Sequence, residues 1–578
     1  MADRIEGVTV DENVMIPMRD GVRLQADVYR PSGSGKFPTL VSRTPYGRQG
    51  LGPLVMADFW TSHGYAVVTQ DTRARFGSEG DIYEPHVNEA QDGYDTIEWA
   101  AAQPWSTGSV GTYGQSYLAA VQYMVAGEAP PSLKAQMPVS GSTDFHQSWI
   151  YHSGGAFEHG WMAAYATSKA RDTASRLGLD SDLPELESEL GPAEGFRPLL
   201  DHSAREMPMT VWADRLSEIA PYFSDYLANP DDGPHWWNIN LRRRFQEVDH
   251  PIYHVGSWYD IFQEGALEGF KGITARGGEH ARPNQKLLMG PWGHIGYTVP
   301  TSGGCGDLDF GSAAAIELKE DQLRWFDYWL KGEDTGVMDD PPVRIFVMGD
   351  NVWREENEWP LARTVYTPWY LHSEGSANTL HGDGGLSEDK PGNERSDSFV
   401  YDPNDPVPTL GGNNLITPPG VFDQTTAEER GDVLCYTSEP LSKEVEVTGP
   451  ISVTLWATSS AVDTDFTAKL CDVRPDGYVQ NVNDGIIRAR YRNSLLKQEM
   501  MTPGQSYEFT IDLWATSHVF KPGHRIRVDI SSSNFPHFDR NPNTGGPIHT
   551  ETEVVPAQQT VFHDINRPSC IILPVIPR

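Results

Sequence analysis

The sequence predicts an α/β domain with a parallel sheet, interrupted by a helical insertion and followed by an all-β domain. Three observations support this prediction. Apolar strands alternate with helical patterns over residues 1–145 and again over 239–345, which is typical of a parallel sheet covered on both faces. Helix-compatible segments dominate residues 146–238. Residues 346–578 show short strands and turns, which favour a β-sandwich of jelly-roll type.

Length and composition limit the class of protein. At 578 residues the chain is too long for one core, and roughly 100–200 residues per domain gives about three domains. The net charge of −35 argues against a nucleic-acid partner, because phosphate binding needs clustered cations. No run of about 20 apolar residues predicts a membrane helix. The scattered acids fit either an ordinary acidic surface or a salt-adapted one, and the sequence leaves both open.

The N-terminal residues and the cysteines indicate a reducing compartment. Residues 1–6 lack the apolar core of a signal peptide. The four cysteines are far apart and show neither metal-site nor disulfide-framework spacing. We therefore expect a cytoplasmic protein with four packed thiols and no catalytic cysteine.

The first domain opens with a predicted hairpin whose turn is Asp20-Gly21, a pair that favours tight turns between strands. The elements expected over the two α/β segments are strands Val14–Met18, Val22–Val28, Phe37–Val41, Tyr65–Thr69, Ile252–Gly256 and Lys286–Gly290, and helices Glu89–Gln103 and Ala313–Leu330. Gly332 is placed to end the last helix. In parallel sheets of this kind, ligands bind at the carboxyl ends of the strands.

The insertion and the C-terminal third differ in their sequence patterns, one helical and the other strand-like. Helices are expected over Met162–Leu177 and Ala213–Leu227, in a stretch rich in aromatic residues. Such an insertion belongs above the strand ends, either as a lid or as ordinary helical core. The strands expected after the insertion and second α/β segment are Val343–Met348, Thr367–Leu371, Ile451–Ala457, Phe466–Val473, Tyr507–Ile511 and Arg525–Ser531.

Ser116 is the candidate nucleophile. A strand-like run precedes Gly114, and helical spacing begins after Ser116, which is the context of a nucleophile elbow. The turn would expose the hydroxyl and direct the Tyr117 N–H toward an oxyanion. The usual glycine two residues after the serine is replaced by Leu118. A small-residue turn that packs a helix on a strand is the alternative.

Two further residues complete a candidate triad. Asp260 and His294 each follow a predicted strand, and the order Ser, Asp, His is that of α/β-hydrolases. A serine hydrolase needs a base for the nucleophile and an acid that orients the base. Asp71 and Asp92 are weaker candidates for that acid because they precede the serine.

Several motifs resemble the cocaine esterase branch (CocE/NonD) of the serine hydrolases related to X-Pro dipeptidyl-peptidases. The resemblance covers nearly the whole chain and follows one order. Its motifs are Thr44-Pro45-Tyr46, Gly114-Gln115-Ser116-Tyr117-Leu118, Trp258-Tyr259-Asp260, Gly290-Pro291-Trp292-Gly293-His294, Asp405-Pro406-Val407-Pro408, Ser460-Ala461-Val462-Asp463-Thr464-Asp465-Phe466 and Ser531-Ser532-Ser533-Asn534-Phe535-Pro536.

The resemblance implies a fold and a set of roles. The fold is an α/β-hydrolase domain with an inserted helical lid and a C-terminal jelly roll. Ser116 is then the nucleophile, His294 the base and Asp260 its orienting acid, and no metal or organic cofactor is required. The Tyr46 hydroxyl would join the Tyr117 N–H as an oxyanion donor. The residues that resemble an acyl pocket are Trp161, Phe262, Leu410 and, with a departure in spacing, Trp149.

The sequence favours a carboxylic ester hydrolase and leaves alternatives. An amide hydrolase, either an X-Pro dipeptidyl-peptidase or a β-lactam acylase-like enzyme, is the second reading. A dipeptidyl-peptidase must anchor an ammonium, for which Glu158 and Glu264 are the available acids. A sugar-binding jelly roll on an inactive scaffold is the third reading, and the intact triad argues against it. The expected partner is a small ester or amide substrate, with a homodimer as one option.

Overall fold

The computed structural model describes residues 7–179, 206–294, 301–415 and 418–578. A ten-stranded sheet forms the α/β domain, in the order β1-β2-β4-β3-β5-β6-β7-β8-β11-β12. Its strands are β1 (Val8–Pro17), β2 (Arg23–Pro31), β3 (Phe37–Thr44), β4 (Ala66–Asp71), β5 (Ser106–Gln115), β6 (Leu133–Val139), β7 (Ile252–Ser257), β8 (Gln285–Gly290), β11 (Val343–Val347) and β12 (Val352–Glu356).

The central strands of this sheet are parallel, from β4 through β11, while β1, β2 and β12 pair antiparallel at the edges. The expected hairpin is confirmed, with Asp20-Gly21 between β1 and β2. Strands β11 and β12 belong to this sheet. The sheet therefore continues past residue 345, where the sequence placed the start of the C-terminal domain.

Helices cover both faces of the parallel sheet, as expected. Apolar residues of α1 and α11 pack on one face, and those of α2, α3 and α10 pack on the other. The bounds are α1 (Leu51–Ser62), α2 (Glu89–Ala101), α3 (Tyr117–Ala126), α10 (Gln263–Arg276) and α11 (Leu318–Phe326). The helix expected over Ala313–Leu330 thus starts later, continues as a π-helix over Asp327–Lys331, and ends at Gly332 with φ +74°.

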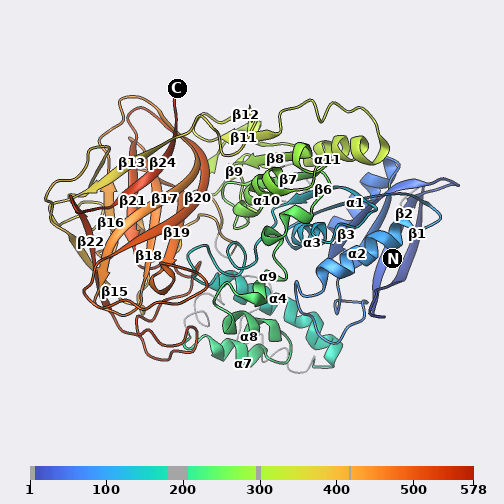
Figure 1. Ribbon diagram of the computed structural model, residues 1–578, viewed down its shortest axis with the longest axis horizontal. Helices are drawn as coiled ribbons and strands as arrows, with labels where there is room; N and C mark the ends of the chain where they lie inside the picture. The colour runs from blue at the N-terminus through green and yellow to red at the C-terminus, as the bar shows by residue number, and fades with distance from the viewer. Residues whose placement is uncertain (1–6, 180–205, 295–300, 416–417) are drawn as a thin grey trace.

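A helical insertion lies between β6 and β7. Its described helices are α4 (His159–Leu177), α7 (Thr210–Leu216), α8 (Pro221–Ala228) and α9 (Pro234–Trp237). Figure 1 shows them gathered along one side of the α/β domain, beside the C-terminal β domain. One hydrophobic cluster joins α3 to these helices. The insertion is therefore seated on the helix that follows Ser116, and its action as a lid stays a prediction.

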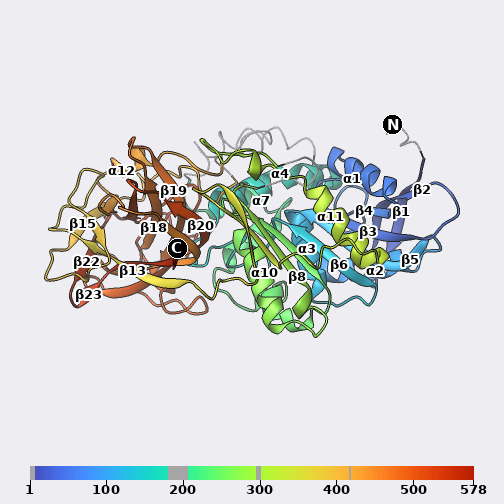
Figure 2. The same ribbon diagram turned by 90° about the horizontal axis from the view of Figure 1, so that it is seen from above.

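In its described residues the C-terminal domain is mostly β, with the short helix α12 (Thr425–Glu428) and a 3-10 turn at Ala489–Tyr491, and it encloses one large hydrophobic core. Its principal strands are β13 (Val365–His372), β14 (Gly385–Ser387), β15 (Asp397–Tyr401), β16 (Leu434–Thr437), β17 (Val445–Ser459), β18 (Asp465–Val473), β19 (Val479–Arg488), β20 (Tyr507–Phe520), β21 (Arg525–Ser531), β22 (Ala557–Asp564), β23 (Arg567–Pro568) and β24 (Cys570–Ile576). Strands β17 and β20 are much longer than predicted. Figure 2 shows this domain beside the α/β domain, at the end opposite to the N-terminus.

A short ribbon of β9 (Gly304–Cys305) and β10 (Leu308–Asp309) contacts the C-terminal domain, because Gly306 forms a bridge with Val421. All four cysteines are buried and free of disulfides, which agrees with the expected packed thiols. Among the described helices, none combines the length and apolar composition required to cross a membrane.

Candidate active site

Ser116 stands on a strained turn between β5 and α3. Its backbone has φ +59° and ψ −126°, a region that residues other than glycine rarely adopt. The Ser116 N–H donates to the Val139 carbonyl at 2.9 Å, which ties the turn to β6. The strand–turn–helix arrangement expected around the serine is therefore present.

The missing glycine of the usual elbow has a structural explanation. Gly114 has φ +145°, and a Cβ there would lie 2.5 Å from the Leu118 Cβ. A Cβ on Gly141 would lie 2.6 Å from the Ala119 Cβ. The close approach between helix and strands is thus supplied by Gly114 and Gly141, and Leu118 is free to join the hydrophobic cluster under the insertion.

Asp260 and His294 form a hydrogen-bonded pair. His294 Nδ1 lies 3.1 Å from Asp260 Oδ1 and 3.3 Å from Oδ2. Asp260 is fully buried, whereas the His294 side chain keeps 17% exposure. The Phe262 N–H also donates to Asp260 Oδ1, at 3.1 Å. A buried carboxylate therefore fixes one ring nitrogen of an imidazole that still reaches solvent.

The sheet register places these residues along one edge. Gln115 pairs with Val139 and Val139 with Val255, while Ser257 pairs with Gly290 on β8. Because β5, β6, β7 and β8 are parallel neighbours, the loops that carry Ser116, Asp260 and His294 all leave the same carboxyl edge. Active-site residues of open α/β sheets gather at this edge.

The loops after β7 and β8 are joined to each other and to the C-terminal domain. The Tyr259 N–H donates to the Trp292 carbonyl at 2.9 Å. The Gln263 amide donates to the Ala515 carbonyl at 2.7 Å, and its oxygen accepts the Ala515 N–H at 3.3 Å. A Cβ on Gly293 would lie 2.8 Å from the Pro419 side chain. The C-terminal domain therefore braces the loops that hold Asp260 and His294.

Tyr46 reaches the serine from the loop after β3. Its hydroxyl interacts with that of Ser116, and desolvation raises the pKa of Tyr46 to about 12. The residue as a whole keeps 41% exposure, so it is the hydroxyl end that the protein surrounds. Tyr46 therefore stays protonated, as a donor, at every pH at which the enzyme would work.

Tyr117 begins helix α3 directly after the serine. The N–H groups of the first helical turn have no partner within the helix, so the Tyr117 N–H is available beside Ser116. Its ring meets Tyr46 edge-on at 6.5 Å between centroids. Its hydroxyl donates to Glu89 Oε1 at 2.8 Å and accepts the His86 N–H at 3.0 Å, so the ring is held at both ends.

Three of the four residues expected to line the acyl pocket come together. Trp149 stacks on Phe262 at 4.1 Å between ring centroids. Phe262 meets the His294 ring edge-on at 5.5 Å and the Trp161 ring at 6.4 Å. These aromatic rings thus form a wall that reaches the imidazole, and Trp149 belongs to it despite its spacing.

Leu410 lies elsewhere. It packs with Val407, Ala427, Val433 and Cys435 inside the C-terminal domain. From the same loop region, Leu415 packs against the cluster under the insertion, and Pro419 reaches the loop of His294. Sequence reasoning missed both residues, and their only local signal is a loop rich in glycine and proline. The place of Leu410 in the acyl pocket stays a prediction.

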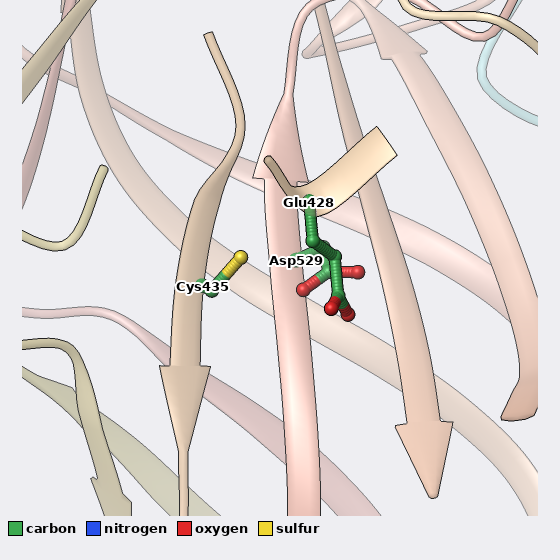
Figure 3. Close-up of side chains that lie close together, drawn as sticks. All are labelled: Glu428, Cys435 and Asp529. Carbon is green, nitrogen blue, oxygen red and sulfur yellow. The ribbon is translucent and has the colours of Figure 1, made fainter. Parts of the chain in front are cut away.

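One cluster in the described residues has the atoms of a metal site. Glu428, Cys435 and Asp529 are buried and offer donor atoms within 4.8 Å of one another. Figure 3 shows the two carboxyl groups side by side, with the Cys435 sulfur turned toward them. Burial and the adjacent Asp529 raise the pKa of Glu428 to about 9. Arg527 pairs with Glu428, and Lys469 lies close by.

The acids of this cluster already face enough positive charge without a metal ion. Two cations face two carboxyl groups that share a proton, so a divalent ion would have to displace that proton and compete with Arg527. We therefore interpret the cluster as a buried acid pair within the C-terminal domain.

Comparisons with known proteins identify the relatives of this chain. The profile of X-Pro dipeptidyl-peptidase (S15 family) matches residues 20–296, and that of the X-Pro dipeptidyl-peptidase C-terminal non-catalytic domain matches residues 335–572. Cocaine esterase from Rhodococcus sp. (strain MB1 Bresler) is 40% identical over 587 residues, which cover 99% of each chain.

Solved structures extend the likeness to the whole fold. An aminopeptidase from the marine sediment archaeon Thaumarchaeota archaeon superposes with a TM-score of 0.83 at 26% identity, over 99% of this chain and 97% of that one. An α-amino acid ester hydrolase gives 0.82 at 26% identity, over 100% and 98% of the two chains. The chain belongs to the cocaine esterase-like (CocE/NonD) family of serine hydrolases, which is related to the X-Pro dipeptidyl-peptidases.

Proposed function

We propose that this serine ester hydrolase works through an acyl-enzyme on Ser116. The supporting observation is the convergence of Ser116 on its strained turn, Tyr46 on its hydroxyl, and the Asp260–His294 pair on the same sheet edge. The His294 Nδ1–H donates to Asp260, which leaves Nε2 to accept the serine proton. Ser116 Oγ then attacks the ester carbonyl carbon.

The tetrahedral intermediate carries its negative charge on the former carbonyl oxygen. The Tyr46 hydroxyl and the Tyr117 N–H donate to that oxygen, which stabilises the transition state more than the bound ester. Collapse breaks the bond to the alcohol, which leaves with the proton from His294. Water, deprotonated by His294, then attacks the acyl-enzyme and releases the acid and free Ser116.

The aromatic wall supports an apolar acyl group. Trp149, Phe262 and Trp161 present ring surface next to the imidazole. Aromatic side chains supply large apolar contact area with few rotatable bonds. An aryl or branched alkyl acyl group suits such a wall.

The X-Pro dipeptidyl-peptidase alternative needs an acid that could anchor a substrate ammonium. Glu158 is buried, with His537 Nε2 at 3.0 Å. Glu264 lines a separate cavity of about 260 Å³ together with Asp144, Arg242 and Asp512. Both acids therefore have partners of their own, which favours esters over X-Pro peptides.

The decisive experiment compares kcat/KM on a matched aryl ester and X-Pro arylamide. We expect an ester preference of several orders of magnitude, and no turnover of either substrate by Ser116→Ala at an unchanged melting temperature. Strong arylamide cleavage would make the chain a peptidase. Retention of more than a few per cent of activity in Ser116→Ala would remove Ser116 as the nucleophile.

We further propose a small ester or amide as the substrate, with neither nucleic acid nor membrane bound. A homodimer is one assembly option, and the proposed location is cytoplasmic. No metal or cofactor enters the proposed mechanism.

A further inference from the structure

Helix α4 brings a lysine to the face of the tyrosine that contacts the nucleophile. Trp161, Tyr165 and Lys169 follow one another at four-residue spacing, so they share one face of the helix. The Lys169 ammonium lies 4.3 Å from the centroid of the Tyr46 ring and 5.6 Å from that of Tyr165. The same helix face therefore offers an aromatic ring to the acyl pocket and a cation to Tyr46.

The surroundings of the Lys169 ammonium are aromatic. Among the described residues, the ammonium contacts these two ring faces and pairs with no carboxylate. The nearest acid on α4, Asp172, lies 3.3 Å from Arg75 Nη1 and is engaged there. Burial and the positive charge of Arg75 lower the pKa of Lys169 to about 8. A lysine held in this way loses its charge within the working range of an esterase.

Other groups around the ammonium fix its position. Arg75, from the loop after β4, donates to the Lys169 carbonyl at 2.9 Å and to the Pro45 carbonyl at 3.0 Å. One guanidinium therefore holds the backbone of Lys169 and the residue before Tyr46. The further titratable side chains near these rings are tyrosines, namely Tyr83, Tyr117 and Tyr222. They stay neutral because burial raises the pKa of each.

A cation on a ring face stabilises negative charge that develops on that ring system. When the Tyr46 hydroxyl donates to an oxyanion, electron density shifts onto its oxygen and ring. The ammonium then stabilises the transition state more than the ground state, so its removal should lower kcat.

We propose that Lys169 is a positioning residue of the oxyanion site, which holds the Tyr46 ring where its hydroxyl meets Ser116 and adds positive charge behind it. This inference rests on the proposed role of Tyr46 as an oxyanion donor. It also makes α4 part of the oxyanion machinery, because displacement of this helix would remove the cation from the ring.

The test measures kcat and KM on an uncharged aryl ester from pH 6 to 10. For Lys169→Met we expect kcat about ten-fold lower at pH 7 with little change in KM. The wild-type kcat should fall as the pH rises through about 8, because the ammonium is protonated below that pH. That fall should be absent in Lys169→Met. Lys169→Arg should keep the neutral-pH kcat and retain it above pH 8, since a guanidinium stays charged.

Two controls separate the possible outcomes. Lys319→Met removes another lysine that sits over a ring, Phe59, at 5.5 Å on α11, and should leave kcat and its pH profile unchanged. The double variant Tyr46→Phe/Lys169→Met should be no slower than Tyr46→Phe alone, because Lys169 acts through the Tyr46 hydroxyl.

A Lys169→Met enzyme with the wild-type kcat and the same decline near pH 8 would overturn the inference. The same decline in Lys169→Arg would also overturn it, and this arm holds even if Lys169→Met fails to fold. If Tyr46→Phe lowers kcat while Lys169→Met does not, only this inference fails. If Tyr46→Phe leaves kcat unchanged, the proposed oxyanion role of Tyr46 fails as well.

Discussion

One buried carboxylate of the α/β domain and two of the C-terminal domain have different kinds of partner. Asp260 is buried against a histidine that remains partly exposed at the sheet edge. In the C-terminal domain, Arg488 lies between Asp465 and Asp539, and all three are buried. A carboxylate paired with a titratable base at an open edge can assist proton transfer, whereas one paired with arginine in a closed core can only hold structure.

The comparison predicts its largest effect for the acid of the first domain. Asp260→Asn should lower kcat by about 10⁴, because an amide favours the wrong tautomer of His294. Steady-state kinetics on an aryl ester and a thermal melt check this. A kcat within ten-fold of the wild type would mean that Asp260 only supports the loop.

The next effect concerns the donor from the β3 loop. Tyr46→Phe should lower kcat by about 10²–10³ with little change in KM, because the lost hydrogen bond acts on the oxyanion. Both kcat and KM are measured at one pH on the same ester. An effect confined to KM would place Tyr46 in substrate binding instead.

The buried arginine of the second domain should affect stability without affecting chemistry. Arg488→Met leaves Asp465 and Asp539 unpaired and should reduce the free energy of unfolding by about 3–5 kcal/mol. Arg525→Met is the matched control: its contact with the exposed Glu439 is 3.8 Å, and such pairs contribute about 0–1 kcal/mol. Urea unfolding measures the free energy of unfolding of both variants. Equal losses would contradict the distinction between the buried and the exposed pair.

The acid pair should show its effect in the pH dependence of stability. The pKa of Glu428 is raised to about 9, so between its ordinary value of about 4.3 and 9 the folded state binds the extra proton. Stability from this group should therefore fall as the pH rises from about 5 to 9. Glu428→Gln mimics the protonated acid and should flatten that part of the profile while leaving kcat unchanged. If the slope of stability against pH is unaltered in Glu428→Gln, another group binds the proton.

Local patterns predicted the parts of the site that depend on neighbouring residues in sequence. The turn at Ser116 follows from a strand, Gly114 and a helix in succession. Asp260 and His294 follow from strand ends, because parallel strands present their carboxyl ends at one edge. The family resemblance added Tyr46, which its loop position alone does not specify.

Contacts between distant segments were not predictable in this way. The periodicity of α4 gives a helix but does not say that Lys169 faces Tyr46, since that depends on how the insertion docks. The same holds for Leu415 and Pro419, which reach the site from another domain. Strands β11 and β12 resemble those of the C-terminal domain in sequence, and only their pairing with β8 assigns them to the first sheet.

The bracing of the catalytic loops also bears on how this gene can be recombined. Gln263 exchanges two hydrogen bonds with Ala515, and Pro419 rests on Gly293. A chimera that takes its C-terminal half from a relative must form both contacts with that relative's own loops. Activity therefore depends on both halves of the chain together. Hybrids with a crossover in the linker between the halves should fold but have lower activity, unless these contacts are kept.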